Sequence, residues 1–257
     1  MEEEFKAQLD LAAERQIAIE FAEKWELALD PPFKYSNVSY VAPTHDDSVL
    51  KVSWSGDDES LHEGEALELW NGDGAVRLLR REGQVLLEER VVPGDDLSEL
   101  SDEEGTAIAV EIARRLWQPG LLPFRPVSPE VAKSLDRAES ENSALVPLAR
   151  ELFAEVGGGA EWLVHGDFHH HNILRSDQGF VAIDPKPYLA DREYDVPSFL
   201  WNPMNNNFTD SSQTERRIRA FVDAGLDDFR IRAWTVIRGS YLRTSAHYVG
   251  PLRALVE

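Results

Sequence analysis

The 257-residue sequence contains no cysteine. Disulfide bonds, thiolate metal ligands and a cysteine nucleophile are therefore excluded. No stretch approaches the run of about 20 apolar residues that a membrane span requires. The segment Met1-Glu2-Glu3-Glu4 is acidic and no apolar segment follows it, which argues against a signal peptide. These absences predict a soluble, cytoplasmic protein.

Basic residues are scarce, because 26 lysines and arginines stand against 47 aspartates and glutamates and give a formal net charge of −21. Nucleic acids and anionic membranes both select positive surfaces, so neither is expected as a partner. The charge suits a cationic substrate. It equally suits plain solubility or an origin in a salty or hot habitat, and composition leaves these explanations open.

The phosphate-binding run G-x-x-x-x-G-K-[ST] is also missing, which disfavours a P-loop enzyme. The strongest positive signal is a polar loop with Asp167 and Asn172 between apolar runs, followed by Phe180 to Ile183 and then Asp184. This order predicts strand, loop, strand, turn, strand, with the three polar side chains close together. Such a group can hold Mg²⁺ on a nucleotide and present a base to a hydroxyl. A hairpin with turn-forming Asp and Asn is the alternative.

Upstream, residues 35–42 and 48–54 are predicted strands, and Lys51 lies among apolar residues in the second. A lysine in this setting usually lies at an edge or faces solvent, but it can also reach nucleotide phosphates from a strand. A helix is predicted for residues 59–70, and one of its glutamates is expected to pair with Lys51. Glu65 is the expected partner, because apolar residues follow it, and Glu63 is the second choice.

The predicted elements change from strands to helices after a hairpin over residues 75–79 and 84–92. Pro93-Gly94 is the best candidate for a boundary between lobes. Residues 1–93 are expected to form an N-lobe with an N-terminal helix and a nucleotide-binding sheet, and residues 94–257 a helical C-lobe. Capping and proline signals place the helices of the second lobe at 101–117, from 128, at 142–156, 195–201, 211–223 and 227–249.

These motifs resemble a known family. The run His165-Gly166-Asp167-Phe168-His169-His170-His171-Asn172 resembles the catalytic loop of aminoglycoside phosphotransferases, and Ile183-Asp184-Pro185 resembles their metal-binding segment. With Tyr194-Asp195-Val196 and Leu200-Trp201-Asn202-Pro203, the chain is most similar to the streptomycin 6-kinase branch, also called the aminoglycoside/hydroxyurea resistance kinases. The resemblance covers roughly Val38 to Pro203. It implies an α+β, bilobal protein-kinase-like fold, with a small antiparallel β-sheet in the N-lobe and a mostly helical C-lobe.

The resemblance implies an ATP-dependent O-phosphotransferase that acts on a hydroxyl of a cationic small molecule, with streptomycin-like aminoglycosides first. Asp167 would accept the proton of the hydroxyl or orient that hydroxyl. Asn172 and Asp184 would hold Mg²⁺. The chain has no G-x-G-x-x-G between its first two predicted strands, which weakens a protein-kinase interpretation.

On the nucleotide side, the resemblance implies that Lys51, fixed by Glu65, holds the α- and β-phosphates. The backbone from Glu88 and Glu89 to Val91 would meet the edge of the adenine. A kinase for a metabolite, such as an amino alcohol or a sugar, is one alternative. A non-catalytic kinase-like protein that only binds a nucleotide or a partner is another, although the intact set of polar residues favours an enzyme.

The acceptor cleft is expected in the helical part after the metal segment, where Asp191 and Asp210 are candidate ligands for a cation, as is His169 from the catalytic loop. Asp195 is interpreted instead as a buried aspartate that braces the loop. The four histidines of the loop raise a zinc site as an alternative. Three consecutive histidines point in different directions in an extended loop, however, and no carboxylate has helical i, i+4 spacing with them.

Overall fold

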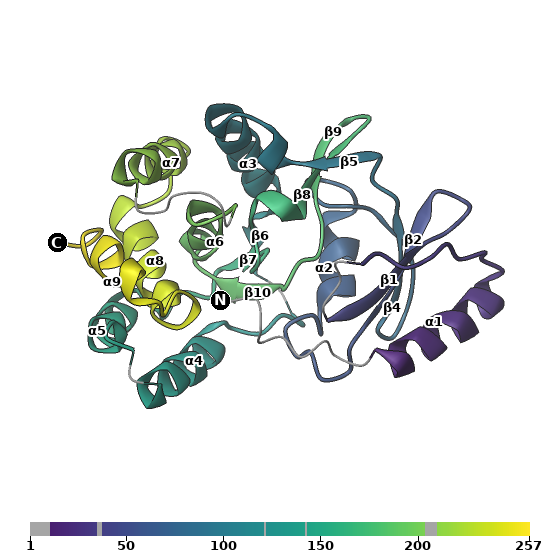
Figure 1. Ribbon diagram of the computed structural model, residues 1–257, viewed down its shortest axis with the longest axis horizontal. Helices are drawn as coiled ribbons and strands as arrows, with labels where there is room; N and C mark the ends of the chain where they lie inside the picture. Colours follow the sequence, from purple (N-terminus) through teal and green to yellow (C-terminus); the bar gives the residue numbers. More distant parts are fainter. Residues whose placement is uncertain (1–10, 35–37, 121, 142, 204–209) are drawn as a thin grey trace.

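The computed structural model describes residues 11–34, 38–120, 122–141, 143–203 and 210–257. A β-rich lobe lies at one end of the molecule and a helical lobe at the other, with α2 and short strands between them (Figure 1). This is the α+β, bilobal arrangement that the motifs implied. None of the described helices has the length and apolar content that crossing a membrane requires.

The sheet of the N-lobe has four antiparallel strands in the order β1-β2-β4-β3. Successive residues of a strand face opposite sides. Leu50 and Val52 therefore share an apolar cluster with Trp25 of α1, while Lys51 between them points to the other face. The elements are α1 (Ala12–Trp25), β1 (Ser39–Pro43), β2 (Ser48–Ser53), β3 (Leu78–Glu82) and β4 (Val85–Glu89).

Helix α2 (Glu63–Trp70) joins the sheet to the rest of the molecule. Its residues Ala66, Leu67 and Trp70 are buried in the main core. The indole Nε1 of Trp70 donates to the carbonyl oxygen of Leu116, 2.8 Å away at the end of α3 (Asp102–Leu116). The helix is therefore anchored on its C-lobe side, and its first turn faces the sheet.

The core of the C-lobe is built around α8, whose residues Ile231, Trp234 and Ile237 are fully buried. Apolar side chains on several sides of one helix indicate that other elements surround it, and α4, α5, α6, α7 and α9 all contact α8. The helices are α3 (Asp102–Leu116), α4 (Ser128–Ser140), α5 (Val146–Val156), α6 (Val196–Leu200), α7 (Ser211–Asp223), α8 (Asp228–Leu242) and α9 (Ala246–Arg253).

Two small antiparallel sheets frame the loop with Asp167. One has the order β10-β7-β6 and the other β5-β8-β9, and the loop runs from β7 through a 3₁₀ turn at His170–Asn172 to β8. The strand, loop, strand, turn, strand order is as predicted. The strands are β5 (Pro93–Asp96), β6 (Gln118–Pro119), β7 (Trp162–Val164), β8 (Ile173–Ser176), β9 (Gly179–Ala182) and β10 (Tyr188–Ala190), and two further 3₁₀ turns lie at Leu97–Glu99 and Arg192–Tyr194.

Some predicted boundaries were wrong. The first hairpin strand lies at β3, three residues later than expected, because Ala75 forms a lone bridge with Ala182 instead. The single helix predicted for 227–249 is two helices, since Arg243 leaves the helical conformation (φ −131°, ψ 60°). The N-terminal helix was predicted for residues 5 to about 29, but α1 ends at Trp25, and residues 5–10 lie outside the described residues. The division into lobes at residues 93 and 94 stays a prediction.

Candidate active site

Lys51 is held between two carboxylates. Its ammonium Nζ lies 2.5 Å from Glu63 Oε1 and 2.5 Å from Asp184 Oδ1, and the lysine is only 5% exposed. Burial disfavours the charged ammonium, but Asp184, Glu63 and Glu88 outweigh burial and raise the pKa of Lys51. The lysine is therefore a fixed positive charge where the two lobes meet.

The expected pairing of Lys51 with Glu65 was wrong, and Glu63, the second choice, is the partner. Glu63 opens α2, and a residue two positions on is rotated by roughly 200° around a helix of 3.6 residues per turn. Glu65 consequently faces away from Lys51. Its Oε1 accepts from Arg81 Nη1 at 2.8 Å.

The residues expected to meet the adenine lie at the end of β4 and just after it. Glu88 is buried. The positive charge of Lys51 acts on its carboxyl, but burial outweighs this attraction and raises the pKa of Glu88. Glu89 is exposed and pairs with Arg77 at 3.3 Å, and Val91 follows, packed against the main core. The nucleotide-binding role of these residues stays a prediction.

Asp195 braces the loop, as predicted. It is fully buried, and its carboxylate accepts from the backbone N–H groups of His165 (3.0 Å) and Gly166 (2.7 Å). The indole Nε1 of Trp117 donates to it as well, at 3.0 Å. Gly166 adopts φ +83°, and a Cβ there would lie 1.9 Å from the carbonyl oxygen of Lys186, so only glycine fits.

His165 is a buried, neutral side chain. Burial lowers the pKa of His165, and its Nδ1 accepts from the Asp167 N–H at 3.3 Å. The proton is thus on Nε2, which donates to the carbonyl oxygen of Ile183 at 3.0 Å. This imidazole ties the segment with Asp167 to the segment with Asp184, and it stacks on Trp70.

Asp167 is held as a carboxylate. Burial opposes ionisation, but His169, Lys186 and Arg238 outweigh burial and keep the pKa of Asp167 well below its usual range. His169 Nε2 lies 3.7 Å from Asp167 Oδ1. An ionised carboxylate in such a place can accept a hydrogen bond from a substrate hydroxyl and so orient it.

Asn172 and Asp184 each present an oxygen atom that can bind a metal ion. The Nδ2 of Asn172 donates to the carbonyl oxygen of Asp167 at 3.0 Å, which leaves Oδ1 as an acceptor. Asp184 adopts a left-handed backbone (φ 56°), and Lys51 lowers the pKa of its carboxyl. An amide oxygen and a carboxylate are a donor set that suits Mg²⁺, which usually keeps several waters and phosphate oxygens as its other ligands.

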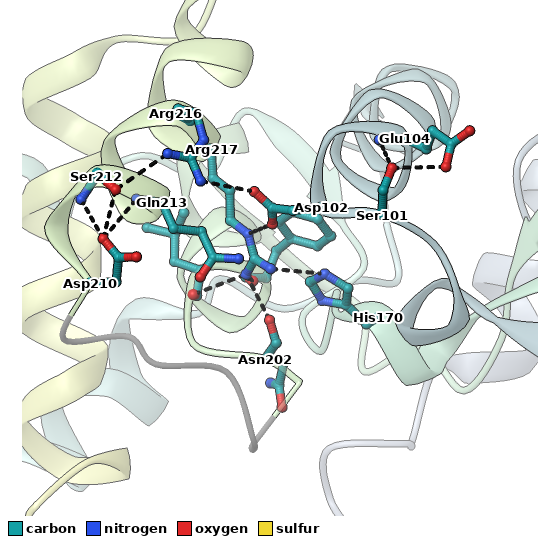
Figure 2. Close-up of polar contacts among 12 residues, drawn as sticks. Ser101, Asp102, Glu104, His170, Asn202, Asp210, Ser212, Gln213, Arg216 and Arg217 are labelled. Carbon is teal, nitrogen blue, oxygen red and sulfur yellow. Dashed lines mark hydrogen bonds and ion pairs between the residues drawn. The ribbon is translucent and has the colours of Figure 1, made fainter.

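The four loop histidines are used separately. His170 stacks on Phe199, and Arg217 donates to its Nε2 at 3.3 Å, whereas His171 Nδ1 pairs with Asp96 at 2.7 Å. Arg217 is itself buried and pairs with Asp102 at 2.7 Å, and Figure 2 shows its guanidinium between Asp102, His170 and Asn202. A side chain of α7 therefore supports the 3₁₀ turn of the loop.

A cavity of about 340 Å³ opens beside Asp167. His169 lines it, whereas Asp191 and Asp210 are not among its lining residues, and the substrate-binding role of all three stays a prediction. Asp191 is turned into the helical lobe, where Arg230 and the Trp234 indole donate to it. Asp210 is the N-cap of α7 and accepts from the N–H of Ser212 at 3.0 Å (Figure 2).

Sequence reasoning missed several residues of this cavity. Its carboxylates besides Asp167 are Glu59, from the loop before α2, and Glu130, in the first turn of α4. Its cations include Lys186 and Arg238. The sequence signals were the position of Lys186 directly after the Ile183-Asp184-Pro185 segment and an arginine inside the apolar run of α8. The two glutamates carried no signal, because they come from distant elements.

Comparisons with known proteins identify the family of this chain. The family model of the aminoglycoside/hydroxyurea antibiotic resistance kinases matches residues 33–249. A streptomycin 3''-kinase of Klebsiella pneumoniae is 31% identical over 194 residues, which cover 70% of this chain and 71% of that protein. A hydroxyurea phosphotransferase of Kitasatospora aureofaciens is 31% identical over 241 residues, covering 85% and 69%. The prediction of a small-molecule kinase is thereby confirmed.

Solved structures support the fold. A choline kinase from Streptococcus pneumoniae superposes with a TM-score of 0.63 at 17% identity and covers 95% of this chain and 99% of its own. A thermostable mutant of an aminoglycoside phosphotransferase gives 0.59 at 18% identity, covering 93% and 98%. Because the family model spans most of the sequence and both relatives are aligned over two thirds of their length, the chain belongs to the aminoglycoside/hydroxyurea antibiotic resistance kinases.

Proposed function

We propose that the protein transfers the γ-phosphoryl group of ATP to a hydroxyl of a cationic small molecule, with streptomycin-like aminoglycosides as the first candidates. The observation that carries the proposal is the ionised Asp167 lining a cavity beside the segment where Asp184 meets Lys51. The streptomycin 3''-kinase among the relatives supports this acceptor class. A location in the cytoplasm stays a prediction.

In this proposal, Asp167 orients the acceptor hydroxyl for in-line attack. Its lowered pKa makes it a weak base, so it takes up the proton late, when the bond to phosphorus has largely formed. Lys51, held by Glu63, binds the α- and β-phosphates, and the backbone from Glu88 to Val91 meets the adenine. Positioning and charge neutralisation then supply most of the catalysis.

Asn172 and Asp184 would hold Mg²⁺, because their oxygens lie on neighbouring segments that His165 ties together. Bound Mg²⁺ neutralises phosphate charge and fixes the phosphate geometry. Asp184→Ala is expected to remove the strengthening of ATP binding by Mg²⁺, measured by calorimetry with and without the metal. Equal Mg²⁺ dependence in the variant and the wild type would contradict this metal site.

For acceptor recognition, Glu130 replaces the aspartates expected from the sequence. It lines the cavity, and its carboxylate pairs with Lys133 at a long 3.9 Å, so the carboxylate is only weakly engaged. A charge-assisted hydrogen bond to an ammonium or guanidinium group is worth roughly 1.5–3 kcal/mol. Hydroxyurea is a second candidate acceptor. The similarity to the hydroxyurea phosphotransferase supports it, because that match covers more of the chain than the match to the streptomycin 3''-kinase.

The test is ATP turnover with a panel of aminoglycosides, hydroxyurea, amino alcohols and sugars. We expect an aminoglycoside to be phosphorylated fastest, and Asp167→Asn to lower kcat by about 10²-fold or more while ATP binding persists. Asp177→Asn, in an exposed turn, is the matched control and should be neutral. Turnover with amino alcohols or sugars alone would favour a metabolite kinase, and no turnover with intact ATP binding would favour a non-catalytic protein.

A further inference from the structure

Lys186 is fixed by its backbone against the loop that carries Asp167. It lies between β9 and β10, flanked by Pro185 and Pro187. Its N–H donates to the carbonyl oxygen of His165 at 2.8 Å, and its own carbonyl oxygen occupies the space that a side chain at Gly166 would need. The start of the lysine side chain is therefore set by the catalytic loop itself.

The ammonium of Lys186 is held from the other lobe. Its Nζ donates to Glu59 Oε2 at 2.9 Å, and both side chains line the cavity with Asp167. Glu59 belongs to the loop between β2 and α2, and the carbonyl oxygen of the preceding Asp58 accepts from Arg125 Nη2 at 2.5 Å. This N-lobe loop thus touches the C-lobe at two adjacent residues.

Stability alone explains this ion pair poorly. The Glu59 side chain is 56% exposed and that of Lys186 26%, and pairs of this kind contribute at most about 1 kcal/mol. The charge of Lys186 acts instead on the site, because it helps to lower the pKa of both Asp167 and Asp184. Because Lys186 and Asp167 line the same cavity, this cation lies where the proposed reaction develops negative charge.

We propose that Lys186 is a further catalytic residue, whose ammonium contacts the transferred phosphoryl group, and that Glu59 is the positioning residue that holds it there. The inference rests on the proposed function. As the acceptor oxygen bonds to the γ-phosphorus, the bond from that phosphorus to the β,γ-bridging oxygen breaks, and ADP keeps the electron pair. The hydroxyl proton passes to Asp167. Lys186 keeps its protons and stabilises the equatorial phosphoryl oxygens.

The test compares Lys186→Met, Lys186→Arg and Glu59→Gln with the wild type and its best acceptor. Loss of one charge-stabilising donor costs about 10²- to 10³-fold in kcat, so we expect Lys186→Met to show this loss with both KM values within about threefold. Lys186→Arg should recover part of kcat, and Glu59→Gln should lose about tenfold. Lys34→Met, at an exposed position before β1, is the matched control and should be unchanged.

A binding measurement separates contact with the phosphoryl group from general damage. ADP with Mg²⁺ and aluminium fluoride mimics the phosphoryl group during transfer. Calorimetry measures the affinity of the protein for this mimic and, separately, its affinity for Mg²⁺–ADP alone. Lys186→Met should weaken the mimic at least tenfold and leave ADP binding unchanged. Equal weakening of both, or a kcat within threefold of wild type, would overturn the role of Lys186. A wild type without phosphotransfer would instead overturn the proposed function.

Discussion

The ammonium of Lys51 is surrounded by more negative charge than it can neutralise. Glu63, Glu88 and Asp184 all act on it, and Asp184 and Glu63 touch it directly. Burial first, and then repulsion from Glu88 and Asp184, raises the pKa of Glu63 from 4.5 to about 8 in spite of the lysine. The folded protein therefore binds a proton at Glu63 that the unfolded chain releases at neutral pH.

This raised pKa makes a prediction about stability. The contribution of Glu63 is fully present below a pH of about 4.5 and is lost as the pH rises through about 8. Glu63→Gln removes the titrating group. The free energy of unfolding of the variant, relative to that of the wild type, should therefore be higher at pH 9 than at pH 5. Urea unfolding without nucleotide at both pH values measures the difference, and an unchanged difference would contradict the raised pKa.

The same substitution should lower kcat/KM for ATP by about tenfold or more at pH 9, because Glu63 is ionised above its raised pKa of about 8 and Lys51 then loses a charged partner. Glu65→Gln is the matched control, since Glu65 pairs with Arg81 on the other side of α2. It should leave kcat/KM for ATP within about twofold. Equal losses in the two variants would mean that the pairing with Glu63 does not position the lysine.

At the scale of elements, α7 is joined to the loop with Asp167 through one arginine. Arg217 Nη1 donates to the carbonyl oxygens of Phe199 and Asn202, both at 2.7 Å, while Nε pairs with Asp102 on α3. With its Nη2 on His170, this guanidinium links α7 to α3, to α6 and the segment after it, and to the 3₁₀ turn (Figure 2). A buried arginine with these partners organises elements that are far apart in the sequence.

Arg217→Met should lower the free energy of unfolding by about 3 kcal/mol, because breaking a buried ion pair and stranding several carbonyl oxygens typically costs 3–5 kcal/mol. The exposed Arg219→Met on the same helix should change it by less than about 0.5 kcal/mol. Chemical denaturation of both variants measures the effect. A loss below about 1 kcal/mol for Arg217→Met would show that water replaces these hydrogen bonds.

Sequence patterns predicted the elements and the loop well, because short-range signals determine them. The apolar runs around Asp167 and Asp184 gave the strand order, and Asp195 was recognised from its motif. What failed depends on side-chain direction or on distant contacts. The start of α2 decides that Glu63 faces Lys51, and no pattern showed that Asp191 accepts a hydrogen bond from Trp234 of α8.

At the scale of the whole molecule, the net charge of −21 and the composition of the cavity act differently on a ligand. The cavity itself is mixed, since Glu59, Glu130 and Asp167 lie beside Lys186 and Arg238. A cation is therefore attracted mainly by the field of the whole surface, which salt screens over a Debye length of about 10 Å at 0.1 M. Within the cavity, a partly buried carboxylate such as Glu130 is screened much less.

These two contributions can be separated by salt and by substitution. Raising the ionic strength from about 0.05 M to 0.5 M should increase KM for a cationic aminoglycoside several-fold and KM for ATP less, while KM for neutral hydroxyurea stays constant. Glu130→Gln should raise KM for the aminoglycoside at every salt concentration, because its contact is local. Asp228→Asn, which removes a surface charge paired with Arg232 on α8, is the matched control and should leave KM within about twofold. If salt moves the KM of hydroxyurea as much as that of the aminoglycoside, the surface charge serves solubility, and recognition of the cation depends on the cavity alone.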